Sequence, residues 1–353
     1  MSQTHDEIRQ QPEALERTLA EGLHLAKKLR RRFEKSRPRL IVLAARGTSD
    51  NAAQFGRYLL EITTGIPVSL AAPSVFTLYR AALDLKDALV VAVSQSGEST
   101  DIDYVLEHAR KYGAITVGVT NEPASTMARL AEYTFLVGAG REKSVAATKT
   151  YTGQVLIFYL LAHALGASMR LDHLQRLPEW AAAALTLEKE TAARAERYRF
   201  MTQAAVVGRG LNYSNAFEFA LKLMETCYVV AERFSISDFL HGPIAMIESS
   251  FPVFLFAPSG VTWPAMHEML TRLEHLKADT LLITDRGNRE ALKVARRAMI
   301  VPLRLGRADA VPEELYTPIP YIIPAQLFAA SLAADKGLDP DHPRSLSKVT
   351  RTL

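Results

Sequence analysis

The sequence has a single cysteine, Cys227, among its 353 residues, so no disulfide can form within the chain. A protein without disulfides suits a reducing compartment, and we expect the cytoplasm. Charged residues or proline interrupt each apolar stretch before it is long enough to cross a membrane. Residues 1–20 are polar and charged, which argues against a secretory signal. These absences predict a cytoplasmic protein with no membrane partner.

The motifs of metal, cofactor and nucleic-acid binding are also missing. The nine histidines have no metal-ligand spacing, and there is no G-x-S-x-G turn or Walker loop. The Gly138–Gly140 pair lacks the further glycine of a dinucleotide fingerprint. The net charge is only +4, and we interpret the one dense basic cluster, at 27–32, as the solvated face of a helix. We therefore expect no metal, no cofactor and no nucleic-acid partner.

Short apolar runs alternate with helical patterns along the chain. With 48% hydrophobic residues, the chain can bury a large core. The alternation predicts an α/β fold in which helices cover both faces of parallel sheets. The expected strands are 40–45, 68–71, 88–93, 114–120 and 133–137, then 204–208, 252–257, 280–284 and 300–303. Residues 5–35 are expected to form a short helix and then one at 14–35. The other expected helices include one that turns Phe55, Tyr58, Leu59 and Ile62 inward, 151–168, 172–198, one that runs through Val230, and 325–336.

The pattern restarts near residue 204 as a weak internal repeat. Arg46–Gly47 reappears as Arg209–Gly210, after a strand in both cases. Beyond one extra residue, five residues from Asn51 to Glu61 match five from Asn215 to Glu225, each pair 164 positions apart. The repeat indicates a duplicated domain. The expected segments are N-terminal helices at 1–35, domains at 36–190 and 191–336, and an irregular tail at 337–353.

The turn Ser94–Ser99 is the first candidate site. It leads from the buried strand 88–93 into a helix with an apolar face at 102, 105, 106 and 109. A helix N-terminus favours an anion, and the serine hydroxyls and the Gln95 amide add donors, so a phosphate would fit. The alternative is an ordinary turn rich in capping residues. A similar turn at 47–51 follows another strand of the same half, and ligands of parallel sheets bind beyond such strand ends.

Three further positions carry side chains able to do chemistry. Lys222 and Glu225 are neighbours on a helix, as either a surface ion pair or a carboxylate held for proton transfer. His241 precedes Gly-Pro and is either a loop histidine bonded to the backbone or a fixed catalytic group. Lys348 lies in the tail, where a solvated charge is the alternative to a functional amine. The residues alone leave these alternatives open.

Six motifs in order make the sequence resemble the sugar-isomerase (SIS) domain family. The resemblance covers residues 35–353 and is greatest to double-SIS members, the isomerase half of glucosamine-6-phosphate synthases and their stand-alone relatives. It implies an α/β fold of two tandem SIS domains, each a flavodoxin-like sheet of five parallel strands with flanking helices. The motifs are RGTSDNA at 46–52, SQSGEST at 94–100, EKSVAATKTYTGQ at 142–154, ALKLMETCYVVAE at 220–232, HGPIAMI at 241–247 and HPRSLSKVT at 342–350.

The resemblance also implies roles for individual residues. Glu225 matches the acid–base that moves a proton between C1 and C2 of a sugar phosphate, with Lys222 beside it. His241 matches a ring-opening histidine that reaches the site from a neighbouring subunit, which implies a homodimer. Lys348 matches the tail lysine that forms an imine with the open-chain sugar. The positions expected to hold the substrate and its phosphate are Ser49, Ser94, Gln95, Ser96, Ser99, Val145 and Ser347.

The sequence departs from the synthases in ways that concern the substrate more than the reaction class. Arg46 replaces a cysteine, Leu240 a lysine and Ser347 an alanine, and Cys227 lies inside a helix, so no glutaminase nucleophile is present. We therefore expect an amino-sugar-phosphate isomerase working as a deaminase, which converts glucosamine 6-phosphate to fructose 6-phosphate and ammonia. The alternatives are a fructosamine-phosphate deglycase, an isomerase of another amino sugar such as galactosamine 6-phosphate, a synthase subunit that receives ammonia from a partner, and a sugar-phosphate-binding regulatory module.

Overall fold

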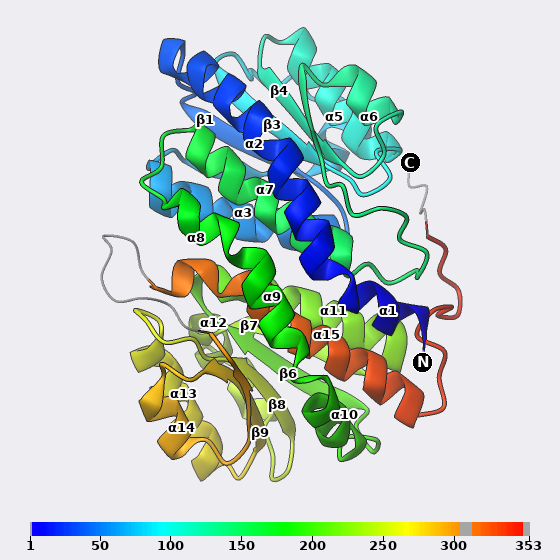
Figure 1. Ribbon diagram of the computed structural model, residues 1–353, viewed down its shortest axis with the longest axis vertical. Helices are drawn as coiled ribbons and strands as arrows, with labels where there is room; N and C mark the ends of the chain where they lie inside the picture. The colour runs from blue at the N-terminus through cyan, green and yellow to red at the C-terminus, as the bar shows by residue number, and fades with distance from the viewer. Residues whose placement is uncertain (1, 304–312, 349–353) are drawn as a thin grey trace. The chain divides into compact units, whose positions relative to one another are not determined.

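The computed structural model describes residues 2–303 and 313–348. The chain divides into two compact units, each built on one sheet (Figure 1). The first-sheet unit comprises residues 13–142, 149–175 and the described residues from 346 on. The second-sheet unit comprises the described residues of 1–12, 143–148 and 176–345. Residues 1–12 and 13–35 thus group with different sheets, and the domain bounds expected from the repeat stay a prediction.

The first sheet has five parallel strands in the order β2-β1-β3-β4-β5. On one face, Val90 and Ala92 pack with Ile102 and Leu106 of α5. Figure 1 shows α2 and α7 across the other face. The strands are β1 (Leu40–Ala44), β2 (Val68–Leu70), β3 (Ala88–Val93), β4 (Ile115–Thr120) and β5 (Tyr133–Leu136). The helices are α2 (Gln11–Lys35), α3 (Thr48–Thr64), α4 (Pro73–Thr77), α5 (Thr100–Lys111), α6 (Thr126–Leu130), α7 (Lys149–Ala164) and α8 (Leu171–Gln175).

The second sheet repeats this topology, with five parallel strands in the order β7-β6-β8-β9-β10. The ring of Phe254 lies 5.1 Å from that of Phe219 in α11 and 5.1 Å from that of Phe328 in α15. The strands are β6 (Gln203–Gly208), β7 (Val230–Ser235), β8 (Pro252–Phe256), β9 (Asp279–Asp285) and β10 (Ala298–Val301). The helices are α1 (Gln3–Arg9), α9 (Leu177–Leu185), α10 (Glu188–Glu196), α11 (Tyr213–Cys227), α12 (Ile236–Leu240), α13 (Trp263–His275), α14 (Arg289–Val294) and α15 (Pro318–Asp335). Three short 3₁₀ turns are η1 (Gly210–Asn212), η2 (Pro243–Met246) and η3 (Glu313–Tyr316).

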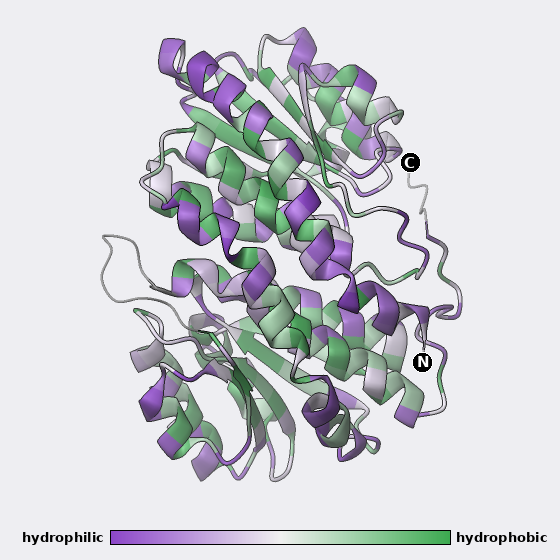
Figure 2. Cartoon of the chain, in the orientation of Figure 1, coloured by the Kyte–Doolittle hydropathy of each residue, from purple (hydrophilic) through white to green (hydrophobic). Residues whose placement is uncertain are grey.

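The two sheets confirm the predicted α/β fold of two five-stranded parallel sheets. The sheet order is that of flavodoxin-like folds, in which the carboxyl ends of the strands form the ligand-binding edge. Figure 2 shows the strands in hydrophobic colours, as expected for sheets buried on both faces. Gly47 and Gly210, the paired glycines of the repeat, both adopt left-handed backbone conformations, with φ of 56° and 57°. Within the described ranges, no helix is both long and apolar enough to cross a membrane.

The helix expected to run through Val230 ends earlier, and the strand after it was not predicted. Tyr228 caps α11 in a left-handed conformation with φ 54°, and Val230 begins β7, which pairs with β6. A non-glycine residue rarely adopts this conformation, so the sequence carries no stop signal here. The strand lies at the sheet edge and is largely exposed, so its sequence, VAERFS, lacks a regular apolar pattern.

The apolar face predicted for α3 is also partly wrong. Ile62 is 54% exposed and Tyr58 is only half-buried. The buried stripe instead runs through Ala52, Phe55, Gly56 and Leu59. Gly56 lets this face of α3 pack against α7, because its missing side chain leaves the ring of Phe158 the place where a Cβ atom would be.

Prolines explain two further differences. The region 172–198 forms three separate helices, and Pro178 stands in the first turn of α9. The helix expected at 325–336 begins at Pro318, because proline is tolerated in the first turn of a helix.

Candidate functional site

The turn Ser94–Ser99 connects the carboxyl end of β3 to the N-terminus of α5. Ser99 is the N-cap residue, yet its side chain makes no capping hydrogen bond. The Ser94 hydroxyl accepts from the Gly97 N–H at 3.1 Å, and the Ser96 hydroxyl accepts from the Glu98 N–H at 3.3 Å. Hydroxyl groups therefore surround the positive end of a twelve-residue helix, an arrangement that suits a phosphate.

Gly97 gives this turn its fixed shape. Its φ is +62°, and a Cβ atom added to it would lie 2.2 Å from Oγ of Ser125. The Gly97 carbonyl accepts from the Met127 N–H at 3.0 Å, so the turn is bonded to the start of α6. Gly97 thus allows the turn to pack closely against the loop between β4 and α6. The sequence did not indicate this contact.

The structure joins the two predicted turns. The Arg46 guanidinium, after β1, lies 3.0 Å from the Asp101 carboxylate in the first turn of α5. Ser49, in the first turn of α3, is buried and its hydroxyl accepts from Nε2 of Gln154 at 3.1 Å. Arg46, the residue that stands in place of a cysteine, therefore adds a cation between the two turns.

In the second-sheet unit, α11 carries a buried ammonium between two carboxylates. Nζ of Lys222 lies 2.7 Å from Oε2 of Glu225 and 3.3 Å from Oε1 of Glu218. Burial by itself would lower the pKa of Lys222, but the two carboxylates outweigh it, so the pKa is raised and the amine stays charged. Glu225 is 22% exposed, so a small molecule can reach the carboxylate that the ammonium orients. This geometry suits proton transfer rather than a surface ion pair.

His241 and Cys227 contrast in exposure. His241 follows α12 and is exposed, and in the described part of the chain its ring makes no hydrogen bond or ion pair. Cys227 is buried, and burial raises the pKa of its thiol to about 11, although a Thr226 hydrogen bond acts in the opposite direction. Cys227 is therefore unsuited to act as a nucleophile.

The tail as far as Ser345 is anchored within the second-sheet unit. The Asp341 carboxylate accepts from the N–H of Gln3 at 2.8 Å and from the N–H of Thr4 at 2.7 Å. The Asp341 carbonyl accepts from the Val145 N–H at 3.3 Å. The Arg344 guanidinium lies 3.9 Å from the ring centre of Tyr228, just after α11.

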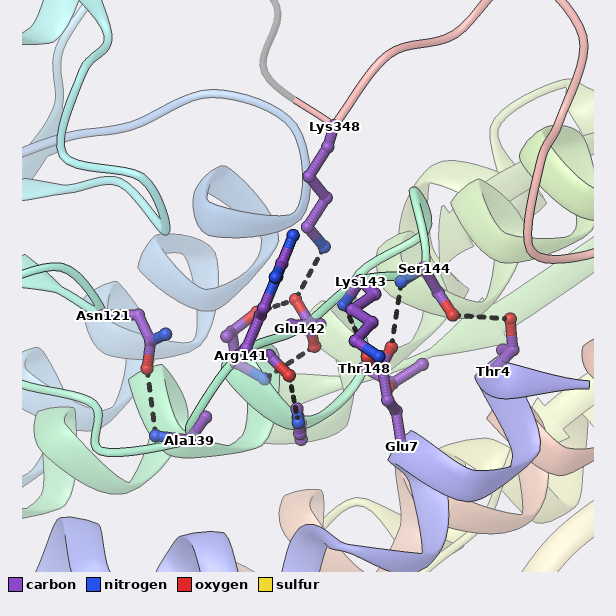
Figure 3. Close-up of polar contacts among 12 residues, drawn as sticks. Thr4, Glu7, Asn121, Ala139, Arg141, Glu142, Lys143, Ser144, Thr148 and Lys348 are labelled. Atoms are coloured by element: carbon purple, nitrogen blue, oxygen red, sulfur yellow. Dashed lines mark hydrogen bonds and ion pairs between the residues drawn. The ribbon is translucent and has the colours of Figure 1, made fainter.

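The last described residues of the tail belong to the first-sheet unit. Nζ of Lys348 lies 2.9 Å from Oε2 of Glu142, so this lysine is not a solvated charge (Figure 3). Ser347 beside it is exposed. Residues 349–353, including the end of the last motif, lie outside the described residues.

Three residues of these networks were not singled out in the sequence. Glu218 lies one turn before Lys222, and that i, i+4 spacing is a signal that could have found it. Asn121, whose side chain donates to the Gly140 carbonyl at 2.9 Å, and Glu142 contact residues 19 and 206 positions away, so no local pattern points to them. Among the described residues, no three or more acidic, histidine or cysteine side chains form a group able to hold a metal ion.

Residues 35–164 and 201–334 each match the family model described as the SIS domain. An isomerizing glutamine–fructose-6-phosphate aminotransferase from Pyrococcus horikoshii is 37% identical over 315 residues, which cover 87% of this chain and 51% of that protein. The chain thus spans about half the length of the curated relatives it matches.

Two solved structures extend this similarity. The C-terminal domain of glucosamine-fructose-6-phosphate aminotransferase from Francisella tularensis is 25% identical with a TM-score of 0.85, covering 97% of this chain and 98% of that one. A glucosamine-6-phosphate deaminase from Thermotoga maritima, at 19% identity and a TM-score of 0.72, covers 95% of this chain and 100% of that one, and shares the fold. With both sheets matched by the family model, the chain belongs to the SIS domain family.

Proposed function

We propose that this chain is a phosphosugar isomerase that moves a proton between C1 and C2 of an amino-sugar phosphate. The observation that carries the proposal is the buried Lys222 ammonium, which holds the accessible Glu225 carboxylate at 2.7 Å. Aldose–ketose conversion requires a base of this kind beside the two carbons, in a fixed orientation.

Each further residue has one role in the proposed mechanism. The turn Ser94–Ser99, with Ser49, holds the substrate phosphate through hydroxyl and backbone donors. Val145 and Ser347 contact the sugar. Lys348 forms an imine with the open-chain carbonyl and stabilises charge that develops there.

We further propose that His241 opens the sugar ring from a second copy of the chain. Its exposed ring has no side-chain partner in the described part of its own chain, which supports a role beside another subunit. The enzyme would then be a homodimer with shared sites.

The overall reaction we propose is deamination: glucosamine 6-phosphate and water give fructose 6-phosphate and ammonia. This reaction needs no nucleophilic thiol, and the buried Cys227 takes no part in it. A fructosamine-phosphate deglycase and an ammonia-dependent synthase are alternatives that use the same proton transfer. A sugar-phosphate-binding regulator would need no base at Glu225.

A coupled assay for fructose 6-phosphate, with purified protein and a panel of phosphorylated amino sugars, tests the proposal. We expect turnover of glucosamine 6-phosphate, and a loss of about a thousandfold in kcat for Glu225→Gln, because the amide cannot accept the proton. Glu268→Gln is the matched control, since Glu268 forms an exposed ion pair with Arg272 on α13. Absence of turnover with every sugar, or full activity of Glu225→Gln, would contradict the proposal.

A further inference from the structure

Glu142 is a buried carboxylate for which the proposed mechanism has no role. It lies in the loop between β5 and α7, and its side chain is completely buried, whereas Lys348 is 24% exposed. Figure 3 shows the Lys348 side chain extending from the tail toward Glu142, with Nζ 2.9 Å from Oε2. A buried carboxylate is costly unless it is paired, so the arrangement calls for an explanation.

The start of α7 holds Glu142 in place. The Thr150 N–H donates to Oε1 at 3.1 Å, and the Thr150 hydroxyl donates to Oε2 at 2.7 Å. The buried Lys149 donates to the Arg141 carbonyl at 2.8 Å, so the preceding residue is bonded to the same helix turn. A helix N-terminus stabilises an ionised carboxylate. Glu142 is therefore a fixed anion whose position does not depend on the tail.

Asn121 connects this loop to the turn Ser94–Ser99. Its side chain donates to the Gly140 carbonyl at 2.9 Å and accepts from the Ala139 N–H at 2.9 Å. Its own backbone N–H donates to the Gln95 carbonyl at 3.1 Å. The loop that carries Glu142 and the proposed phosphate turn thus share one hydrogen-bonded edge of the first sheet.

We propose that Glu142 is a positioning residue for Lys348. Its carboxylate holds the tail lysine at the sheet edge that carries the phosphate turn. An ion pair shielded from water is strong enough to offset the side-chain freedom that a lysine loses when it is held. The imine role of Lys348 rests on the proposed function, but the effect of Glu142 on the amine can be measured without any sugar.

Amine labelling of the full chain tests this inference. Lys348 is carbamylated with cyanate at about pH 8, and the labelled peptide is quantified by mass spectrometry. Glu142→Gln removes the charge but keeps an oxygen to accept from Thr150. We expect Lys348 to be labelled about tenfold faster, because Nζ is no longer held against a buried carboxylate. Glu142→Asp keeps the charge and should stay within about threefold of the wild-type rate.

The matched control is Glu34→Gln, since Glu34 forms an exposed ion pair with Arg30 in the same unit. It should leave labelling of Lys348 unchanged. If Glu142→Gln does not fold, the wild type is used alone, and Lys348 should be labelled at least about threefold more slowly than Lys86, which is exposed in the same unit. Labelling of Lys348 that matches the wild type in the folded variant would overturn the inference.

Kinetics separate positioning from substrate binding. We expect Glu142→Gln to lower kcat about tenfold and to change KM less than about threefold, because the phosphate turn is intact. Unchanged kcat would overturn the positioning role. Borohydride trapping of fructose 6-phosphate on wild-type Lys348 reports on the proposed function separately, since a missing adduct contradicts imine formation without altering the labelling result.

Discussion

The residue that organises the proposed chemistry is Lys222, an ammonium held between two acids on one helix. Its side chain is 3% exposed, so Glu218 and Glu225 rather than water stabilise the charge. Removing one partner of such a group leaves the others buried and uncompensated. This arrangement explains how one carboxylate can stay both accessible and fixed in orientation.

Asp103, in the first turn of α5, gives the fold a pH dependence. Burial, followed by the nearby Glu98 and Glu107, raises its pKa to about 7, and its Oδ1 is buried with no hydrogen-bond partner. The folded chain then keeps a proton that the unfolded chain loses between about pH 4 and about pH 7. The free energy of unfolding should therefore fall as the pH rises through this range.

Asp103→Asn should remove this part of the pH dependence. Above about pH 7 the variant should be about 1 kcal/mol more stable than the wild type, because no buried charge has to form. Urea unfolding at about pH 5 and about pH 8 measures the difference. A wild type and variant with equal stability at the higher pH would refute this account of Asp103.

Local spacing predicted the Lys222–Glu225 pair, because residues three apart on a helix are neighbours. Glu142 and Lys348 are 206 positions apart, so only the fold brings them together. The same holds for Arg46 and Asp101, whose contact depends on the order of β1 and β3 in the sheet.

At the scale of elements, the turn after β3 has a counterpart after β8, but the two differ in what fills them. In the second-sheet unit, a buried carboxylate of the chain itself, that of Glu314, accepts from the Thr262 N–H at 3.2 Å and its hydroxyl at 2.7 Å. A Cβ atom on Gly260 would lie 2.8 Å from the same carboxylate. Burial raises the pKa of Glu314, while the Thr262 hydrogen bonds act against this. An internal carboxyl group thus lies at the place that corresponds to the proposed phosphate site.

Glu314→Ala should lower the free energy of unfolding by about 2 kcal/mol, because it leaves the Thr262 donors without their acceptor. Glu314→Gln keeps an oxygen at this place and should lose less than half as much. Urea unfolding of both variants checks the prediction. Equal stability of Glu314→Ala and the wild type would show that the carboxylate does not hold the turn together.

The helix ends that the sequence failed to predict have two physical causes. Tyr228 ends α11 in a conformation that favours glycine, so the helical pattern continues past the true end. Three prolines, Pro318, Pro320 and Pro324, obscure the first half of α15, although the helix continues through them. Buried strands such as β3 were predictable because both faces are covered and every residue is apolar.

For the whole molecule, the repeat predicted two sheets of the same topology, and the structure has them. The grouping of segments was less predictable, since residues 143–148 belong to the second-sheet unit while the residues on either side belong to the first. The tail likewise changes units after Ser345. The unit to which a segment belongs depends on tertiary contacts rather than on a local pattern. Composition and periodicity therefore do not reveal it.

We propose that Glu225 moves a proton between the first two carbons of a sugar phosphate. Proton transfer through a carboxylate exchanges the proton with solvent, so the claim can be tested in heavy water without knowing the final product. Glucosamine 6-phosphate and fructose 6-phosphate are incubated in turn with the wild type and with Glu225→Gln, and deuterium at C1 and C2 is followed by nuclear magnetic resonance. We predict enzyme-dependent deuterium at these carbons with the wild type and almost none with the variant. A wild type that incorporates no deuterium into either sugar, or a variant that incorporates as much as the wild type, would contradict the claim.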